Sequence, residues 1–214
     1  NGDTTTFSST NSQDPLLIIK NTTNDANGSR MHFVKDKGAA GADGDDIGII
    51  DFISDDAAQA QTTFARIIAE VSESANTDEA GKLSFFVAES DGTTTALAAG
   101  LVLEGEHATN GEVDVTIAAG TASTTTVAGD LVITTQVTAT GGSVSAPTYS
   151  FIGDTDTGIS RPTADAVNIV AGGTERLRAD SGGVDVIGSL DVSVNAVIGG
   201  TALVTGVLTT TATQ

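Results

Sequence analysis

Alternation of apolar and polar residues is the dominant pattern along the chain. From Val184 the even-numbered positions are mostly apolar as far as Ile198, while the odd-numbered positions carry Asp, Ser and Asn. The same period of two occurs in "LSFFVAE", residues 83–89, and in "GEVDVTIAAG", residues 111–120. Successive side chains of a β-strand point to opposite faces of its sheet. The pattern therefore predicts an all-β chain whose strands bury one face and are separated by Gly, Asp, Asn and Ser clusters.

One segment carries a competing helical pattern. In "SDDAAQAQTTFARIIAEVSES", residues 54–74, Ser54 is a suitable N-cap and apolar residues follow at spacings of three and four. A strand interpretation places the odd-numbered residues from Ala65 to Val71 on one face, with a poorer division between apolar and polar sides. On local grounds alone, the pattern favours a helix.

Two segments resemble each other, and neither can bury an apolar face alone. "AGDLVITTQVTATGG", residues 128–142, and "IGSLDVSVNAVIGG", residues 187–200, share a Gly-x-Leu start, an alternating middle and a Gly-Gly end. Units of this kind bury their apolar face only against a neighbour. We expect them to stack along the chain or to associate with other copies.

Composition points to thin, repetitive β structure. The 214 residues include 25 glycines, no tryptophan and 4% aromatic residues, which supply few large side chains for the interior of a compact enzyme. An apolar fraction of 39% is nevertheless too high for a disordered chain. The apolar residues must therefore pack against something, and partner chains are a natural candidate.

Charge narrows the classes of partner. Nine basic and 28 acidic residues give a net charge of −19, which repels nucleic acids and anionic membranes, so we expect neither nucleic-acid binding nor membrane insertion. The chain has no cysteine, which excludes disulfides, thiolate metal sites and cysteine nucleophiles.

Two groups of motifs resemble modules of tail fibre and fibre-like virion proteins of tailed bacteriophages, particularly marine ones. The first group is "IGIIDFISDD", "FARIIAEVSESANTDEAGKLSFFVAESDG" and "LVLEGE", within residues 47–105. The second is "FIGDTDTGISRP" followed by "VNIVAGGTERLRADSGGVDVIGSL", within residues 151–190. Together they cover about half of the chain, and their order and spacing are more specific than any single motif.

The resemblance implies an elongated homotrimeric fibre, with a β-prism or triple β-helix-like shaft and small interposed β domains. Residues 64–71 would then form a strand. It also implies partners among other virion tail or baseplate proteins, and a host-surface glycan or protein as receptor. The expected location is the virion, outside the cell, and the expected role is structural attachment to the host without enzymatic activity or cofactors. We expect a β connector over residues 1–30, a first β domain over 31–120, and a Gly/Thr-rich β shaft over 121–214 with an inserted module at about 147–190.

Two other functions remain open on the sequence. A self-assembling extracellular filament or adhesin on a prokaryotic cell surface would have the same β-rich, cysteine-free composition. A fibre-type polysaccharide depolymerase would need two carboxylates facing each other across a sugar. The acidic segment with Asp43, Asp45, Asp46 and Asp51 is better interpreted as a solvated turn before a strand, because no aromatic platform lies nearby.

The stretch "GDTDTGISRP" contains the only metal candidates, Asp154 and Asp156. As an EF-hand-type calcium loop it fits poorly, because the glycine comes one position early and the twelfth position lacks a glutamate. We interpret it as a turn in which the carboxylates accept backbone N–H bonds and Gly158 takes a positive φ. A weaker Ca²⁺ or Mg²⁺ site completed by a neighbouring subunit is the alternative.

The remaining candidate residues favour structural roles. His32 and His107 are the only histidines, and no Gly-x-Ser-x-Gly elbow accompanies them, so we expect no catalytic triad. Arg176 and Arg178 share one face of a predicted strand, where we expect salt bridges to carboxylates of partner chains. Receptor-contacting residues are not distinguishable among the Thr, Ser, Asp and Gly of the loops.

Overall fold

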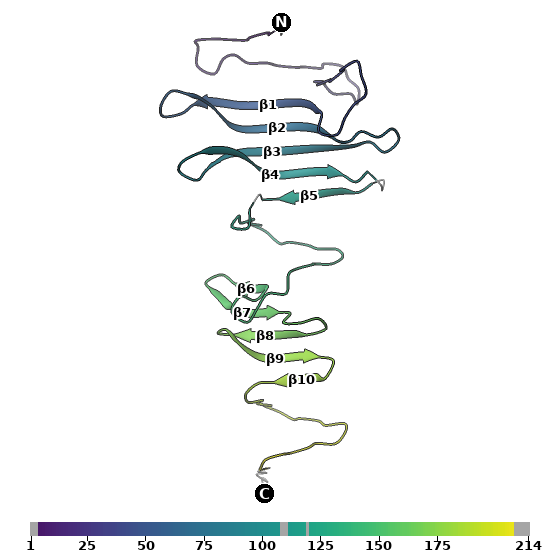
Figure 1. The fold of residues 1–214 in the computed structure, drawn as a ribbon, viewed down its shortest axis with the longest axis vertical. Helices are drawn as coiled ribbons and strands as arrows, with labels where there is room; N and C mark the ends of the chain where they lie inside the picture. Colours follow the sequence, from purple (N-terminus) through teal and green to yellow (C-terminus); the bar gives the residue numbers. More distant parts are fainter. Residues whose placement is uncertain (1–3, 108–110, 119, 208–214) are drawn as a thin grey trace. The chain divides into compact units, whose positions relative to one another are not determined.

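The chain divides into two units, Asn1–Gly129 and Asp130–Gln214, in a computed structural model that describes residues 4–107, 111–118 and 120–207. The described residues form ten β-strands and no α-helix (Figure 1). The prediction of an all-β chain is thus confirmed. It follows that the described residues contain no helix long and apolar enough to cross a membrane.

The first unit contains a five-stranded antiparallel sheet in which each strand pairs with its neighbours in sequence (Figure 1). Its strands are β1 (Asp46–Asp55), β2 (Gln61–Glu73), β3 (Ala80–Ser90), β4 (Thr95–Gly105) and β5 (Val113–Ile117). The helical pattern over residues 54–74 is therefore misleading, and the strand implied by the resemblance is correct. β2 pairs along its length with β1 and β3, and these two ladders satisfy its backbone groups on both sides.

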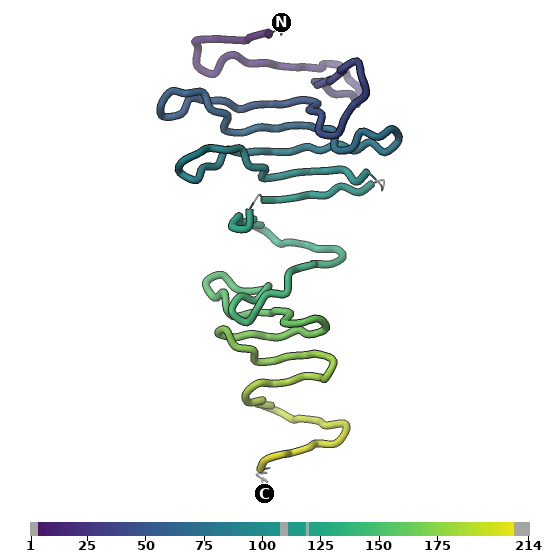
Figure 2. The backbone as a smooth tube through the Cα atoms, in the orientation of Figure 1, coloured from purple at the N-terminus to yellow at the C-terminus, as the bar shows by residue number. Residues whose placement is uncertain are grey.

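The second unit contains another five-stranded antiparallel sheet with the same sequential order. Its strands are β6 (Tyr149–Phe151), β7 (Asp154–Ser160), β8 (Val167–Ala171), β9 (Thr174–Asp180) and β10 (Gly183–Val186). Short turns join successive strands, and the backbone reverses direction at each of them (Figure 2). The sheet is thus another meander, built from hairpins.

The alternating segment that begins at Val184 is a strand only as far as Val186. Residues 187–207 form no strand, and apolar side chains such as Val194 are exposed. The predicted long strand with one buried face is therefore wrong for the single chain. A strand needs a neighbour for its N–H and C=O groups, and no strand is paired to this segment in the described part of the chain.

Each sheet is one layer thick, and the buried core is small. Within the described residues of each unit, no second layer of strands or helices covers the sheet. Apart from Pro147, only Ile68, Ala166 and Val170 are buried among the described apolar residues, whereas large apolar side chains on all ten strands are partly or fully exposed. The chain by itself therefore has little of the apolar burial that normally stabilises a domain.

Candidate functional site

Asp154 and Asp156 lie in strand β7, after the turn and not within it. The turn is formed by Ile152 and Gly153, and Gly153 has a φ of +82°. Among the hydrogen bonds of the described residues, neither carboxylate accepts a backbone N–H, so that part of the turn interpretation is wrong. Their segment is held by its backbone, where the carbonyl oxygen of Asp156 accepts a bond of 2.8 Å from the N–H of Gly173.

No group of three or more His, Asp or Glu side chains that could hold a metal ion occurs in the described part of the chain. Asp154 and Asp156 alternate with Thr155 along an exposed strand. Two carboxylates without a third ligand are a weak donor set for Ca²⁺, which takes six to eight oxygens. We therefore assign no metal to this pair.

Gly158 in the same motif has a clear structural role. Its φ is +156°, which confirms the positive φ predicted from the sequence. A Cβ built at this position would lie 1.8 Å from the carbonyl oxygen of Tyr149. Strands β6 and β7 approach each other so closely here that only glycine fits. The motif therefore marks a tight strand pairing.

The acidic residues before and within β1 bind separate partners. Asp43 accepts hydrogen bonds from the N–H and Oγ of Ser74, at 2.9 and 2.7 Å. Asp45 accepts bonds from Nζ of Lys37 at 2.6 Å and from the N–H of Ala42 at 2.9 Å. These two donors hold the pKa of Asp45 below its usual value. Both carboxylates thus fasten the loop that precedes the sheet.

Asp51 forms the best-defined ion pair of the first sheet. Its two carboxylate oxygens accept bonds of 2.6 and 3.1 Å from Nε and Nη2 of Arg66 on the neighbouring strand. This bidentate contact holds the pKa of Asp51 below its usual value. The pair joins β1 to β2, which is a structural use of the carboxylate.

His107 and Arg178 also find partners within the chain. Nδ1 of His107 lies 3.3 Å from Oδ2 of Asp78, and this hydrogen bond raises the pKa of the imidazole. Nε of Arg178 donates a bond of 2.8 Å to Oδ2 of Asp180, two residues along the same strand. The predicted pairing of Arg176 and Arg178 with partner chains remains a prediction.

One face of the first sheet is apolar across all five strands. We call it the first apolar face and define it by two cross-strand rows of directly paired residues. The central row is Ile50, Ile67, Phe85, Leu101 and Ile117, and the next row is Gly48, Ala69, Leu83, Leu103 and Val115. Every member of the two rows is exposed or half-buried in the single chain. The first apolar face is therefore not covered by a protein layer in this unit.

The opposite face of the first sheet carries the charged side chains, and we call it the mixed face. One of its rows is Asp46, Glu70, Lys82, Glu104 and Asp114, and the row at the centre is Ile49, Ile68, Ser84, Val102 and Thr116. Lys82 and Glu70 form a 3.3 Å ion pair on it, and Oγ of Ser72 bonds to the carboxylate of Glu104. Ile68 and Ser84, at 8% and 2% exposure, are the buried residues of this sheet.

The second sheet repeats this division. Its apolar row crosses all five strands and consists of Tyr149, Ile159, Ile169, Leu177 and Val186. On the opposite face Asn168 is fully buried, accepts a bond from Oγ of Ser160 and donates one of 2.6 Å from Nδ2 to Oε2 of Glu175. Polar groups are thus satisfied on one face while the apolar row stays open on the other.

Sequence reasoning from periodicity identified only some of the strands, such as β3 and β5, and missed the faces themselves. Alternation assigns each side chain to one of two sides, but it does not tell which sides of neighbouring strands coincide. The register of the four strand pairs in the first sheet supplies that information.

Comparisons with protein-family models, with curated proteins and with solved structures found no match to this chain.

Proposed function

We propose that the chain is a structural segment of a phage tail fibre that assembles as a homotrimer. In this proposal the apolar faces of several copies form the core that one copy lacks, within a β-prism or triple β-helix-like shaft. The observation that carries the proposal is the pair of single-layer sheets, each with an open apolar face opposite a face that holds hydrogen-bonded polar or charged side chains.

The accessible surface of the chain supports the need for partner chains. It amounts to 17507 Å², whereas a compact monomer of 21.3 kDa exposes about 9,000 Å². At about 25 cal/mol per Å² of apolar surface removed from water, even a small part of this excess would contribute many kcal/mol if covered. Association of copies covers such surface without any change in the fold of each sheet.

The exposed turns of the meanders are the parts that a fibre would present to a host cell. The turn after β3, Ser90–Thr94, is tied by Asp91, whose Oδ1 accepts bonds of 2.8 Å from the N–H groups of Thr93 and Thr94. These bonds hold the pKa of Asp91 below its usual value. Ordered polar turns at the ends of a rigid sheet suit attachment to a glycan or protein, in keeping with a non-enzymatic role outside the cell.

The assembly is tested by the mass of the protein in solution. Sedimentation equilibrium or light scattering should give three times 21.3 kDa under native conditions and the monomer mass in denaturant. A folded monomer of 21.3 kDa under native conditions would refute the proposal.

The place in the virion is tested by electron microscopy of particles of the encoding phage. Antibodies raised against this chain should label the tail fibres and block adsorption to host cells. Labelling of filaments on a prokaryotic cell, with none on particles, would instead favour the alternative of an extracellular filament or adhesin.

A further inference from the structure

We infer that the first apolar face is the surface through which copies of this chain bind one another, and that the mixed face is turned to solvent. This inference rests on the proposed function, to which it adds the side of the sheet that forms the interface. The occupant of the first apolar face is the same face of further copies.

The two faces of the first sheet differ more in the chemistry of their side chains than in the exposure of those side chains. The ten residues of the two apolar rows contain no polar side chain. The mixed face carries Asp51, Arg66, Glu70, Lys82 and Glu104 in hydrogen bonds or ion pairs within the chain. Turning the mixed face inward would remove these charges from water, which is unfavourable, whereas burying the first apolar face removes only apolar surface from water.

The most buried positions of the first sheet lie on the mixed face. Ser84 and Ile68 are 2% and 8% exposed although no second layer lies over them. On the first apolar face the equivalent position in β3, Leu83, is 38% exposed, and Val115 in β5 is 55% exposed. On β2 and β3 the mixed face therefore leaves less surface open than the first apolar face, although Ile49 on β1 is as exposed as Leu83, at 38%.

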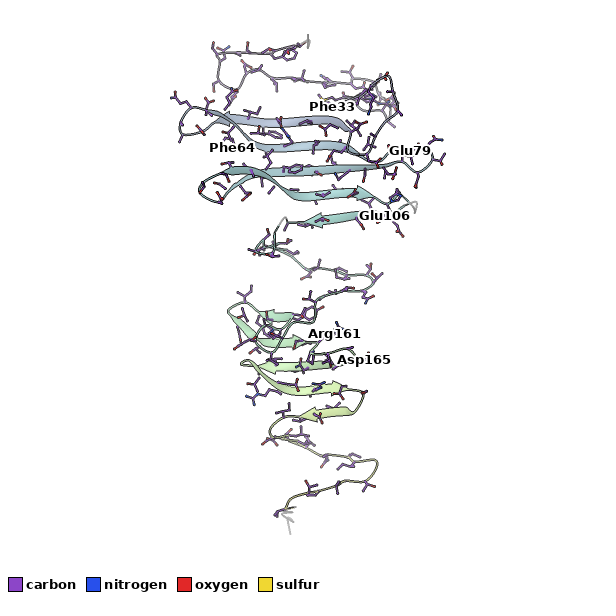
Figure 3. The ribbon with its side chains drawn as sticks, in the orientation of Figure 1. Phe33, Phe64, Glu79, Glu106, Arg161 and Asp165 are labelled. Carbon is purple, nitrogen blue, oxygen red and sulfur yellow. The ribbon has the colours of Figure 1, made fainter. Side chains whose placement is uncertain are left out.

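A short segment of the chain shows that apolar side chains pack on this face. Phe33, from the segment before β1, is labelled beside that strand in Figure 3. A Cβ at Gly48 of β1 would come within 2.7 Å of Cβ of Phe33, so the two residues lie against each other. Phe33 and Gly48 also border, with Ile50, Ile67 and Leu83, a hollow on the first apolar face. The cover is limited to this corner, and the rows toward β5 remain open.

The size of the first apolar face suits a stable interface. Five strands at about 4.8 Å spacing and about four residues of each at about 3.3 Å give the two rows an area of about 300 Å² in projection. A standard protein interface buries about 800 Å² of accessible surface on each partner. Accessible surface exceeds projected area because side chains protrude, so the two rows supply a substantial part of such an interface.

Net charge favours the same orientation. Each copy carries a charge of −19, so copies repel one another most where carboxylates would meet. Contact through the first apolar face keeps Asp51, Glu70, Glu104 and Asp114 on the far side of each sheet. The repulsion between copies is then weakened by distance and by salt.

Two adjacent residues of β5 provide a matched test. Val115 lies on the first apolar face and Thr116 on the mixed face, both are exposed in the single chain, and the two side chains have nearly the same volume. Because the chain has no cysteine, V115C and T116C each introduce a single thiol into the full chain. Each variant is treated with a thiol-reactive probe, and its solution mass is measured in parallel.

In the native oligomer V115C should react at least about ten-fold more slowly than T116C, and in denaturant the two should react at equal rates. An oligomer in which T116C is protected and V115C reacts freely would overturn the inference but leave the proposed function standing. An oligomer in which both react equally would also overturn it, because the two faces would then be equally open or equally covered. A monomer would refute the proposed function, and protection of V115C in that monomer would show that the chain covers its own apolar face.

Discussion

Replacing Gly158 by alanine should detach strand β6 from β7. In the native sheet Tyr149 is directly opposite Ile159, and Ser150 is opposite Gly158. A Cβ at Gly158 would lie 1.8 Å from the carbonyl oxygen of Tyr149, and real Cβ contacts essentially never fall below 3.0 Å. The backbone must therefore move by at least the difference of 1.2 Å, which is more than the hydrogen bonds of this short pairing tolerate.

The free-energy cost of Gly158→Ala has two parts. A non-glycine residue at a φ of +156° costs roughly 1–3 kcal/mol, because this region is nearly restricted to glycine. Loss of one or two backbone hydrogen bonds between β6 and β7 adds about 1 kcal/mol each. Together these give a destabilisation of about 2–5 kcal/mol. The measured loss cannot exceed the free energy that holds β6 on the sheet, because β6 has only three residues and can separate without unfolding the rest.

Hydrogen exchange measured by mass spectrometry follows this local opening. Amides of residues 149–160 in Gly158→Ala should exchange roughly 30-fold or more faster than in the wild type, because each 1.4 kcal/mol corresponds to a factor of ten. Gly153→Ala is the matched control, since Gly153 also has a positive φ, of +82°, but its added Cβ would have no atom within 4 Å. Equal exchange in the two variants would refute the assignment of Gly158 to a close strand approach.

Two further changes test the polar contacts. Asn168→Ala removes the buried partner of Glu175 and should lower the free energy of unfolding in urea by about 1–3 kcal/mol. Asn195→Ala, at an exposed position, should leave this free energy unchanged. Equal effects of the two changes would contradict a structural role of the buried amide. Because Asp78 raises the pKa of His107, the stabilisation by this pair should be complete below about pH 6.5 and disappear as the pH rises through the raised pKa. An NMR titration should show a lower His107 pKa in Asp78→Asn than in the wild type, and an unchanged pKa would refute the pairing.

The strands were predictable where alternation is regular and a neighbouring strand exists. Leu83, Phe85 and Val87 lie on one side of β3, and Val113, Val115 and Ile117 lie on one side of β5, as the period of two indicates. The same alternation beyond Val186 produces no strand. Periodicity records where side chains would point, whereas pairing depends on a partner that local sequence does not reveal.

The helical pattern around Ile67 failed for a related reason. Its spacings of three and four are real, but the alternating set from Ala65 to Val71 matches apolar residues of β3 in register, including Leu83 and Phe85. Tertiary pairing overrides the local preference here. The turn in "GDTDTG" was misplaced because glycine and aspartate are both typical of turns, while only the geometry shows that Gly153 forms the turn and Gly158 the close approach.

The strictly sequential pairing of both sheets has a consequence for how such a chain can change in length. Each strand is hydrogen-bonded only to the strands before and after it, so no crossover links distant parts of a sheet. Two added or removed strands restore the direction of the chain, and directly paired residues keep their side of the sheet. A hairpin is therefore the natural unit of insertion or deletion, because gaining or losing one extends or shortens the apolar row without turning any remaining side chain to the other face.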